Sequence, residues 1–447
     1  MSEATPPTWL DVPLGQLVKG FRGVSYRPEN LLNHASDSTV TLLRATNIQQ
    51  GNLTFDDVQF VPSRLVAPTQ ILTGGDIAVC MSNGSKALVG KAAQYRRSEQ
   101  TVYTVGAFCS IFKPIEKADS EFVFHLFRSQ AYQKNIDVVL AGSAINNLKN
   151  SSIESAIFRV PADKNKRQKI ASILTSIDTA IEKTEALIKK YQHIKAGLMH
   201  DLFTRGVLPN GQLRPPREQA PELYQETAIG WIPREWRLSK AGDLCSLITK
   251  GTTPASSDMW ESSEGIRFLR VDNLTFDGRF DFITSSYRIS DMTHTTVLSR
   301  SKCVPGDVLM NIVGPPLGKV SLVTAEVGEV NINQAIAVFR PTASLSSIYL
   351  LRWLLSTGAK RWLLQRAKQT SGQLNLTLAM CQELEIPLPS IEEQGLMEMR
   401  LQAAERLVQS DMTRLKKLQT QKLGLMQDLL TGKVAVMVDV PATEAAT

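Results

Sequence analysis

The sequence predicts an α+β fold in which two similar globular α/β domains are separated by an antiparallel coiled coil of two long helices. Three observations support this prediction. The 447-residue chain contains an internal repeat. The first part of each copy alternates short β-type runs with turns rich in Gly, Pro, Asn and Asp. The last part of each copy is about 40 residues long and carries one apolar stripe at helical spacing.

The repeat consists of pairs of similar segments that occur in the same order, about 230 residues apart. Three of these pairs are "LRATNIQQGNLTF" (43–55) with "LRVDNLTFDGRF" (269–280), "SIFKP" (110–114) with "AVFRP" (337–341), and "GLMHDLFTRGV" (197–207) with "GLMQDLLTGKV" (424–434). Two like modules in one chain are expected to be related by a pseudo-twofold axis.

Each long helical segment needs a partner, because a single apolar stripe on a helix roughly 60 Å long would otherwise stay exposed. We predict that the two helices pair with each other. The alternative is that each helix packs only against its own globular domain. Gly206 and Gly432 are expected to end the helices. The predicted interface residues are Ile170, Leu174, Ile177, Ile181, Ile188, Tyr191, Leu198 and Leu202 with Leu401, Ala404, Val408, Leu415, Leu418, Leu425 and Leu429; Ile173, Ala180, Leu187 and Ile194 widen the first stripe.

The first helix is followed by a stretch rich in Pro and polar residues, which is typical of a linker. The predicted boundaries are a first globular domain at 1–162, a long helix at 163–206, a linker at 207–235, a second globular domain at 236–390, a second long helix at 391–433 and a tail at 434–447.

The composition narrows the class of protein. The formal net charge of +7 is compatible with a polyanionic partner. The five cysteines lie far apart and none of the five histidines forms a metal-spaced pair, so we expect reduced thiols and no metal site. The chain shows no signal peptide and no apolar run long enough to cross a membrane, from which we expect a cytoplasmic protein without a membrane partner.

One motif imitates a nucleotide-binding loop. The stretch "SNGSKALVGK" (82–91) has two glycines and a final Gly-Lys pair. A phosphate-binding loop needs four residues between its glycines, and a Ser or Thr after the lysine. Here five residues separate Gly84 from Gly90, and Ala92 follows Lys91. The second copy has "GPPLGK" at the same place, so we expect a turn.

Two similar domains held apart by helices in a basic chain suggest a reader of two DNA half-sites. The motifs "ETAIGWIPREWRLSKAGDL", "KGTTP" (250–254), "VGPPLGK" and "NINQAIAVFRP", with the helix ends "LMHDLFTRG" and "LMQDLLTGK", resemble the specificity subunit of type I restriction–modification systems. The resemblance extends over essentially the whole chain. The first copy departs most, because its entry "TPPTWLDVPLGQLVKGFRG" is shortened and has no equivalent of "GTTP", and its "VGAFCSIFKP" lacks the Asn-Gln of the second copy.

The resemblance implies that each globular domain is a target recognition domain that reads one half of a bipartite, asymmetric DNA target. The helices would set the unread gap and dock two methyltransferase subunits, to which restriction/translocase subunits attach. S-adenosylmethionine, ATP and Mg would be bound by those partners, and this chain would be non-catalytic. The sequence agrees, since it contains no Asn/Asp-Pro-Pro-aromatic motif for amino methylation.

Residues that differ between the copies are the better candidates for base contacts, because specificity requires differences. Arg44 and Arg270 occupy one repeat position, which favours a structural or phosphate role. Lys91 and Lys319 are interpreted as turn lysines near phosphate or as solvated surface residues, and Asn147 and Asn375 as turn formers or DNA-facing residues. The candidate DNA-contacting residues are Arg22, Tyr26, Arg27, Arg44, Asn83, Ser85, Lys86, Lys91 and Asn147 in the first copy, and Thr252, Thr253, Ser256, Arg270, Arg279, Asn311, Lys319 and Asn375 in the second.

Two other classes of function stay open at this point. A coiled-coil adaptor would join two protein-binding domains without DNA specificity, and an enzyme in its own right would need a cofactor site that the motifs do not provide. Outward charges on the helices are interpreted as a solvated face or a docking surface; they are Lys183, Lys189, Lys190, Arg414, Lys416 and Lys417.

Overall fold

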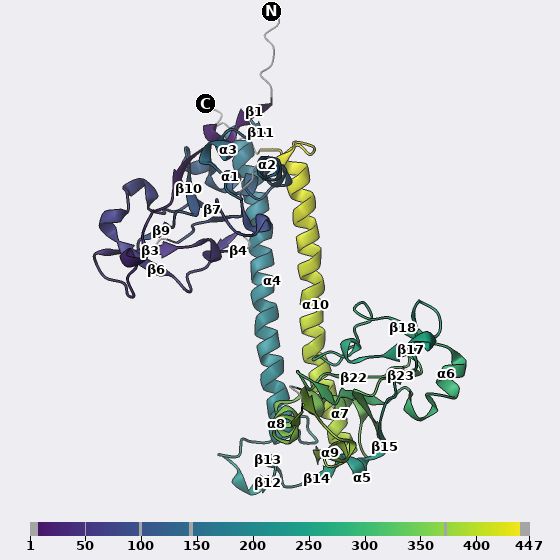
Figure 1. Ribbon diagram of the computed structural model, residues 1–447. Helices are drawn as coiled ribbons and strands as arrows, with labels where there is room; N and C mark the ends of the chain where they lie inside the picture. Colours follow the sequence, from purple (N-terminus) through teal and green to yellow (C-terminus); the bar gives the residue numbers. More distant parts are fainter. Residues whose placement is uncertain (1–7, 50, 98–100, 143–145, 371–372, 439–447) are drawn as a thin grey trace, which may run out of the picture. The chain divides into compact units, whose positions relative to one another are not determined.

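The computed structural model describes residues 8–49, 51–97, 101–142, 146–370 and 373–438. The chain divides into two compact units, of which unit 1 comprises residues 1–186 and 412–447 and unit 2 comprises residues 187–411. Each unit contains one globular mixed α/β domain and half of each long helix (Figure 1). The predicted α+β class with two similar domains and two long helices is confirmed. The expected N-terminal start of the first domain and the end of the tail, 1–7 and 439–447, lie outside the described residues.

Unit 1 builds its globular domain from short strands that are followed by three short helices and the first long helix. The strands are β1 (Trp9–Pro13), β2 (Val18–Arg22), β3 (Thr39–Leu43), β4 (Ile48–Gln49), β5 (Asn52–Leu53), β6 (Gln59–Pro62), β7 (Ile77–Cys80), β8 (Ala92–Gln94), β9 (Tyr103–Val105), β10 (Cys109–Pro114) and β11 (Ile157–Pro161); the helices are α1 (Ser120–Leu126), α2 (Gln130–Ala141), α3 (Asn150–Glu154) and α4 (Lys164–Arg205).

Unit 2 repeats this order after a hairpin that lies in the expected linker. The strands are β12 (Tyr224–Thr227), β13 (Gly230–Pro233), β14 (Arg237–Lys240), β15 (Cys245–Lys250), β16 (Trp260–Glu261), β17 (Ile266–Leu269), β18 (Tyr287–Ile289), β19 (Lys302–Cys303), β20 (Val308–Asn311), β21 (Val313–Gly314), β22 (Val320–Leu322), β23 (Val330–Ile332), β24 (Ile336–Pro341), β25 (Lys368–Thr370), β26 (Gln373–Asn375) and β27 (Glu385–Leu388). The helices are α5 (Ala241–Leu244), α6 (Asp291–Thr295), α7 (Ser347–Leu355), α8 (Thr357–Arg366), α9 (Leu378–Gln382) and α10 (Ile391–Leu430).

The sheets of the two domains have the same topology. The four-stranded sheet has the order β2-β10-β7-β8 in unit 1 and β15-β24-β20-β22 in unit 2. A second sheet contains β6-β3-β9 in unit 1 and the matching β18-β17-β23 in unit 2, with β3–β9 and β17–β23 as parallel pairs. Even a half-buried ion pair is repeated, as Asp76–Lys113 in unit 1 and Asp307–Arg340 in unit 2. The duplicated sequence segments therefore form the same arrangement of strands in both domains.

The long helices run antiparallel within each unit. In unit 1, Ile170 and Leu174 of α4 share a core with Leu429 of α10, while the later residue Asp178 pairs with the earlier Lys422. In unit 2, Leu202 shares a core with Leu401. Every predicted interface residue is buried or half-buried, and the predicted pairing of the helices is confirmed.

Two features of the helix packing differ from the expectation. Ile194, which was expected to widen the stripe, is 49% exposed, because it lies on the side of α4 that faces solvent. In addition, the ends of the stripe pack on globular domains as well as on the other helix, so the two packing modes coexist. Ile170 and Leu174 contact the cluster around Phe122 and Phe158.

The helix pair contains the same polar contact in each unit. Asp178 of α4 accepts bonds from Lys422 Nζ of α10 at 2.5 Å and from Arg128 Nη1 at 2.7 Å. In unit 2, Glu405 of α10 pairs with Lys195 of α4 at 2.6 Å and with Arg352 at 2.6 Å. A carboxylate between a lysine of the other helix and an arginine of the domain thus fixes the register in both units.

Each helix ends on a glycine under a tryptophan, at φ +65° for Gly206 and +75° for Gly432, where a side chain would be strained. A Cβ at Gly206 would lie 2.4 Å from the Trp236 ring, and a Cβ at Gly432 would lie 2.7 Å from the Trp9 ring. The C-terminal end of α10 therefore packs against the first strand of unit 1, as the end of α4 packs against the start of the second domain.

Candidate nucleic-acid interface

Two loops meet at the same edge of each domain because a glycine allows them to approach. A Cβ at Gly23, after β2, would lie 2.2 Å from the carbonyl oxygen of Gly106. A Cβ at Gly251, after β15, would lie 1.8 Å from the carbonyl oxygen of Ile332. The "GVSY" of residues 23–26 is therefore the spatial counterpart of "GTTP" in the second copy, and the expectation that the first copy lacks such an element was wrong.

In unit 1 the loops enclose an open recess of about 440 Å³. We call it the unit 1 recess. It brings together three predicted residues, Tyr26, Arg44 and Asn83, from segments far apart in the sequence. It also contains Gln59 and Phe108, which were not predicted from the sequence. The complete lining is Tyr26, Arg44, Ala45, Thr46, Gln59, Ser82, Asn83, Gly84, Gly106, Phe108 and Cys109.

The recess has an aromatic rim and a set of polar groups. The rim includes Phe108, which is 68% exposed. The backbone carbonyl of Phe108 accepts hydrogen bonds from the amides of Met81 (2.8 Å) and Ser82 (3.1 Å). Tyr26 Oη donates to Gln59 Oε1 at 3.3 Å. Burial raises the pKa of the Cys109 thiol to about 12, so this thiol is neutral at pH 7 and is no nucleophile.

Arg44 and Arg270 hold equivalent positions with different partners. Each arginine begins a short turn. Its backbone amide donates a hydrogen bond to the side-chain oxygen of the asparagine three residues later, at 2.8 Å in both copies. Arg44 Nη2 bonds to Asp57 at 2.6 Å, whereas the guanidinium of Arg270 lies 5.3 Å from the centre of the Tyr287 ring. The two arginines therefore share a backbone turn and differ in what their guanidinium groups contact.

Asn311 was expected to contact a base, and the structure contradicts this. Its side chain is fully buried in β20. Its Oδ1 accepts bonds from the amides of Gly318 and Lys319, both at 2.9 Å, and its Nδ2 donates to the carbonyl of Pro316 at 2.9 Å. The residue holds the "GPPLGK" turn and has no free edge for DNA. Its counterpart in unit 1 is Cys80, so a difference between the copies was mistaken for a difference in specificity.

The other predicted residues lie on or near the same loops. Arg22 bonds through its two terminal nitrogens to the carbonyl of Leu148 (3.2 Å) and to Asn147 Oδ1 (3.4 Å), which ties β2 to the turn before α3. In unit 2, exposed Thr253 donates a hydrogen bond to Gln334, which was not predicted as a site residue. Arg279 is held by Asp277, and Lys319 Nζ donates to the carbonyl of Val271 at 3.3 Å. Arg27, Ser85, Lys86, Thr252 and Ser256 are exposed, and Lys91 and Asn375 are half-buried.

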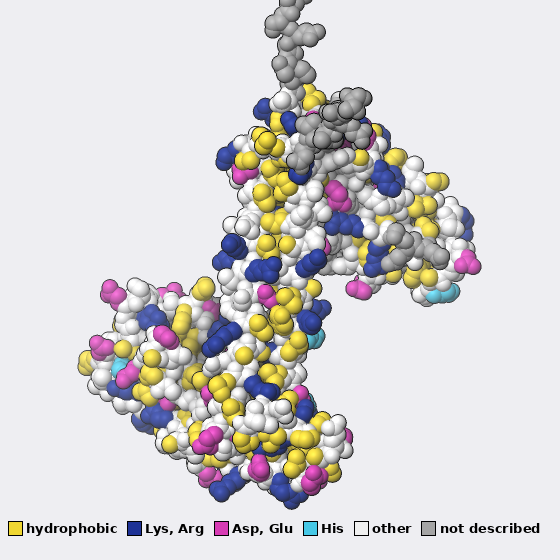
Figure 2. Space-filling view, turned by 180° about the vertical axis from the view of Figure 1, so that it is seen from behind, with side chains coloured by type: hydrophobic (Ala, Val, Ile, Leu, Met, Phe, Trp, Pro, Cys, Tyr) yellow, Lys and Arg dark blue, Asp and Glu magenta, His cyan; other side chains and the backbone are white. Residues whose placement is uncertain are grey.

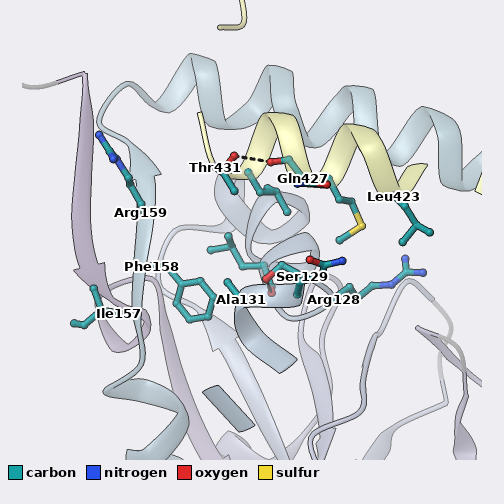
Figure 3. Close-up of a pocket in the computed structure, with 13 residues that line it drawn as sticks. Arg128, Ser129, Ala131, Ile157, Phe158, Arg159, Leu423, Gln427 and Thr431 are labelled. Atoms are coloured by element: carbon teal, nitrogen blue, oxygen red, sulfur yellow. Dashed lines mark hydrogen bonds between the residues drawn. The ribbon is translucent and has the colours of Figure 1, made fainter. Parts of the chain in front are cut away.

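A second cavity in unit 1 is a groove between α2, β11 and the end of α10 (Figure 3). Its apolar lining includes Leu126, Ile157 and Leu423. The counterpart of Leu126 in unit 2 is Trp353, because each lies three residues before an equivalent capping serine, Ser129 or Ser356. Trp353 is buried and donates to the carbonyl of Glu385 at 3.1 Å, which fills the equivalent space.

Close to this groove lies a buried histidine. His125 has no exposed surface, and desolvation lowers its pKa to about 3, although Asp178 acts in the opposite direction. Its Nε2 lies 3.1 Å from Thr175 Oγ1, and its Nδ1 has no hydrogen-bond partner among the described residues. The counterpart in unit 2 is Arg352, which bonds to Glu405.

The described surface is mixed rather than uniformly basic, and Figure 2 shows Lys and Arg side chains among apolar patches along the paired helices. Among the described residues, no cluster of three or more His, Cys, Asp or Glu side chains is arranged to hold a metal ion. Within the same part of the chain, no helix is both long and apolar enough to span a membrane.

Two solved structures share this fold over almost the whole chain. A chain described under the complex assembly and conformational transition of the type I R-M system matches with a TM-score of 0.58 and 17% identity, and covers 97% of this chain and 100% of that one. The type I restriction-modification S subunit from M. genitalium matches with a TM-score of 0.55 and 13% identity, covering 96% and 98%. The fold of this chain is therefore similar to the folds of these two chains over almost their whole lengths.

The sequence assigns the family. The chain belongs to the family of the type I restriction modification DNA specificity domain, whose model matches residues 68–190 and 233–420. The EcoKI specificity subunit of Escherichia coli K12 is 26% identical over 401 residues, which is 87% of this chain and 80% of that protein. The StySPI specificity subunit of Salmonella potsdam is 30% identical over 193 residues, or 42% and 41%.

Proposed function

We propose that this chain is the DNA-recognition subunit of a type I restriction–modification complex, and that each globular domain reads one half of a bipartite, asymmetric target. The observation that supports the proposal is that the two domains share one sheet topology and carry different side chains on the two loops that meet at the same edge of each domain. A reader of an asymmetric sequence needs equal scaffolds and unequal contacts. An adaptor without DNA specificity has no such requirement, and family membership also supports the DNA role.

Two measurements test this proposal. Binding of the full chain to duplex DNA should weaken steeply between low and moderate salt, because lysines and arginines displace condensed counterions. Exchange of residues 1–160 with those of a relative should change one half of the methylated sequence in the host genome and leave the other half unchanged. If both halves or neither changed, the assignment of one domain to one half-site would be wrong.

We also propose that α4 and α10 set the unread gap and dock two methyltransferase subunits. The helices have 42 and 40 residues. The cations that they expose are Lys183, Lys189, Lys190, Arg414, Lys416 and Lys417. The exposed apolar residues of α10 point to a covered surface. They are Ile391, Met399, Leu407, Met412 and Leu423.

The gap is tested by inserting four residues in the middle of α4 and an equal insertion in α10. Four helical residues add about 6 Å, which corresponds to roughly two base pairs. The two half-sites should stay the same while the gap between them grows. An unchanged gap would show that the domain surfaces, and not the helices, set the spacing.

We assign the chemistry to the partners. S-adenosylmethionine would be bound by the methyltransferase subunits, ATP and Mg by the restriction/translocase subunits, and the complex would act on DNA in the cytoplasm. The purified chain alone should transfer no methyl group to target DNA, and activity should appear when the methyltransferase subunit is added. Methyl transfer by the chain alone would contradict the assignment.

A further inference from the structure

The unit 1 recess contains side chains that differ from those at the same positions in unit 2. Phe108 and Ala335 are equivalent, because their carbonyls accept the matching amides of Met81 and Ile312. Tyr26 and Pro254 each lie three residues after an equivalent glycine. Strand pairing makes Gln59 equivalent to Tyr287, since Thr41 pairs with Phe60 as Arg267 pairs with Arg288. The side chains of the recess therefore differ between the two units, while the backbone positions that carry them are equivalent.

The hydrogen-bonding groups of the recess favour one base. Guanine is read mainly by a free arginine or lysine, and no lysine lines the recess. Arg44 is not free, because its Nη2 is bonded to both the carbonyl and the carboxylate of Asp57, and its Nε is buried. Reading of cytosine needs a carboxylate acceptor. None of the residues that line the recess is acidic.

Two amides line the recess, Gln59 and Asn83. Asn83 Oδ1 accepts a bond from the amide of Ser85 within its own loop at 3.0 Å, whereas Gln59 is oriented by another side chain of the recess, Tyr26. Gln59 Oε1 is held by the hydroxyl of Tyr26 and keeps a second lone pair, while its Nε2 has no partner among the described residues. An amide with one free N–H edge and one free oxygen lone pair matches N7 and the N6 amino group of adenine in the major groove. The bond to Tyr26 also fixes the orientation of this amide in advance, which reduces the entropy lost on binding.

Phe108 adds an apolar contact at the rim. Its backbone is fixed by two hydrogen bonds, so its ring projects from a rigid loop instead of a flexible one. A large aromatic side chain that is 68% exposed leaves apolar area without a partner in the free protein. The apolar group of DNA that is accessible in the major groove is the C5 methyl of thymine.

We propose that the unit 1 recess reads an A·T base pair in the major groove, with Gln59 bound to N6 and N7 of adenine and Phe108 packed against a thymine methyl at or next to that pair. Tyr26 is a positioning residue that acts through Gln59. The inference rests on the proposed DNA-recognition function and adds the identity of a base pair to it.

The first test uses the full chain with its methyltransferase partner, and sequences the methylated sites. In the Gln59→Glu variant, the carboxylate can accept a bond from the N4 amino group of cytosine and repels adenine N7. One A·T position in one half-site should change its preference to C·G by at least about tenfold, and the other half-site should stay the same. Gln16→Glu, which makes the same charge change at an exposed position of the same domain outside the recess, should leave the target unchanged.

The second test needs no change in the fold of the protein. One thymine at a time in the target duplex is replaced by uracil, which removes only the C5 methyl. Affinity of the unmodified chain should fall by roughly fourfold at one thymine of that half-site, as expected for one buried methyl group. The Phe108→Ala variant should bind the thymine and uracil duplexes equally.

The two tests distinguish a failure of the proposed DNA-recognition function from a failure of the A·T assignment. If the complex showed no sequence preference at all, the proposed function itself would fail. If it recognised a bipartite target but Gln59→Glu shifted no base and no uracil substitution mattered, the recognition role would stand and the assignment of the recess would be overturned. A shift to C·G in one half-site together with a methyl-dependent thymine supports the assignment.

Discussion

The two domains of this chain differ in a way that separates scaffold from recognition. Both contain the same four-stranded sheet, the same ion pair between adjacent strands (Asp76–Lys113 and Asp307–Arg340) and the same asparagine-closed turn after Arg44 and Arg270. They differ at the rim of the facing loops. Variation between the repeats therefore does not by itself indicate a binding residue. Asn311 varies and is buried, and its role is to hold a turn.

The largest effect is expected from an acid placed in the shared part of the helix packing. Leu174 in unit 1 and Leu202 in unit 2 are both fully buried. Leu174→Asp and Leu202→Asp should each lower the free energy of unfolding by more than about 4 kcal/mol, because an unpaired carboxylate replaces a packed side chain. Urea denaturation measures the loss, and Ser172→Asp on the exposed face of α4 is the control. A small loss at either position would mean that the units do not use α4 equally.

A smaller difference is expected between the two interhelical ion pairs. Asp178 is 8% exposed and Glu405 is 27% exposed. Asp178→Asn should cost about 3 kcal/mol, because two cations lose a buried partner, whereas Glu405→Gln should cost about 1 kcal/mol in its wetter site. Denaturation at low and high salt tests this, and the loss at Glu405 should depend more on salt. Equal losses would contradict the difference in burial.

Acid should affect unit 1 more than unit 2, because His125 stands where unit 2 has Arg352. The folded pKa of about 3 lies below the ordinary 6.5, so below pH 6.5 the unfolded state binds a proton that the folded state does not. The free energy of unfolding should therefore decrease as the pH is lowered below 6.5, and the decrease should reach about 2 kcal/mol at pH 5. The groups that face this histidine are Asp178, Arg128, Lys422, Arg96 and Thr175.

The variant His125→Gln isolates this contribution. It should flatten the pH dependence of the urea midpoint between pH 6.5 and 4.5, above the range in which carboxylates dominate. A slope equal to that of the unmodified chain would assign the acid sensitivity to other groups.

A small gain in stability is expected from filling the groove of unit 1. Leu126→Trp should fill the groove as Trp353 does in unit 2 and raise the free energy of unfolding by about 1 kcal/mol. The reverse change, Trp353→Leu, should lower it by about 3 kcal/mol because it creates a cavity. Thermal denaturation of the two variants measures both signs. Destabilisation by Leu126→Trp would show that the backbones around the two sites are not equivalent.

The sequence predicted the architecture because its signals are redundant. The order of duplicated segments, the apolar stripes from Ile170 to Leu202 and from Leu401 to Leu429, and the final glycines all indicate two domains and two long helices. The site was less accessible. Gln59 and Phe108 become neighbours only through the pairing of β3 with β6 and the close approach at Gly23, and neither is visible in a linear pattern. Burial of Asn311 was hidden for the same reason, since a polar residue at the end of a strand is compatible with either face.

The position of the last helix has a consequence for biosynthesis. Unit 2 ends at residue 411, whereas unit 1 also requires residues 412–447. Leu429 and Leu430 belong to its core, and Gly432 lies under Trp9. A ribosome that adds 5–20 residues per second needs roughly 10 to 45 s to translate the stretch between the two parts of unit 1. The N-terminal domain therefore emerges first but is completed last. During this interval the apolar side chains around Leu174 lack their contacts with Leu429 and Leu430, and they are exposed to chaperones.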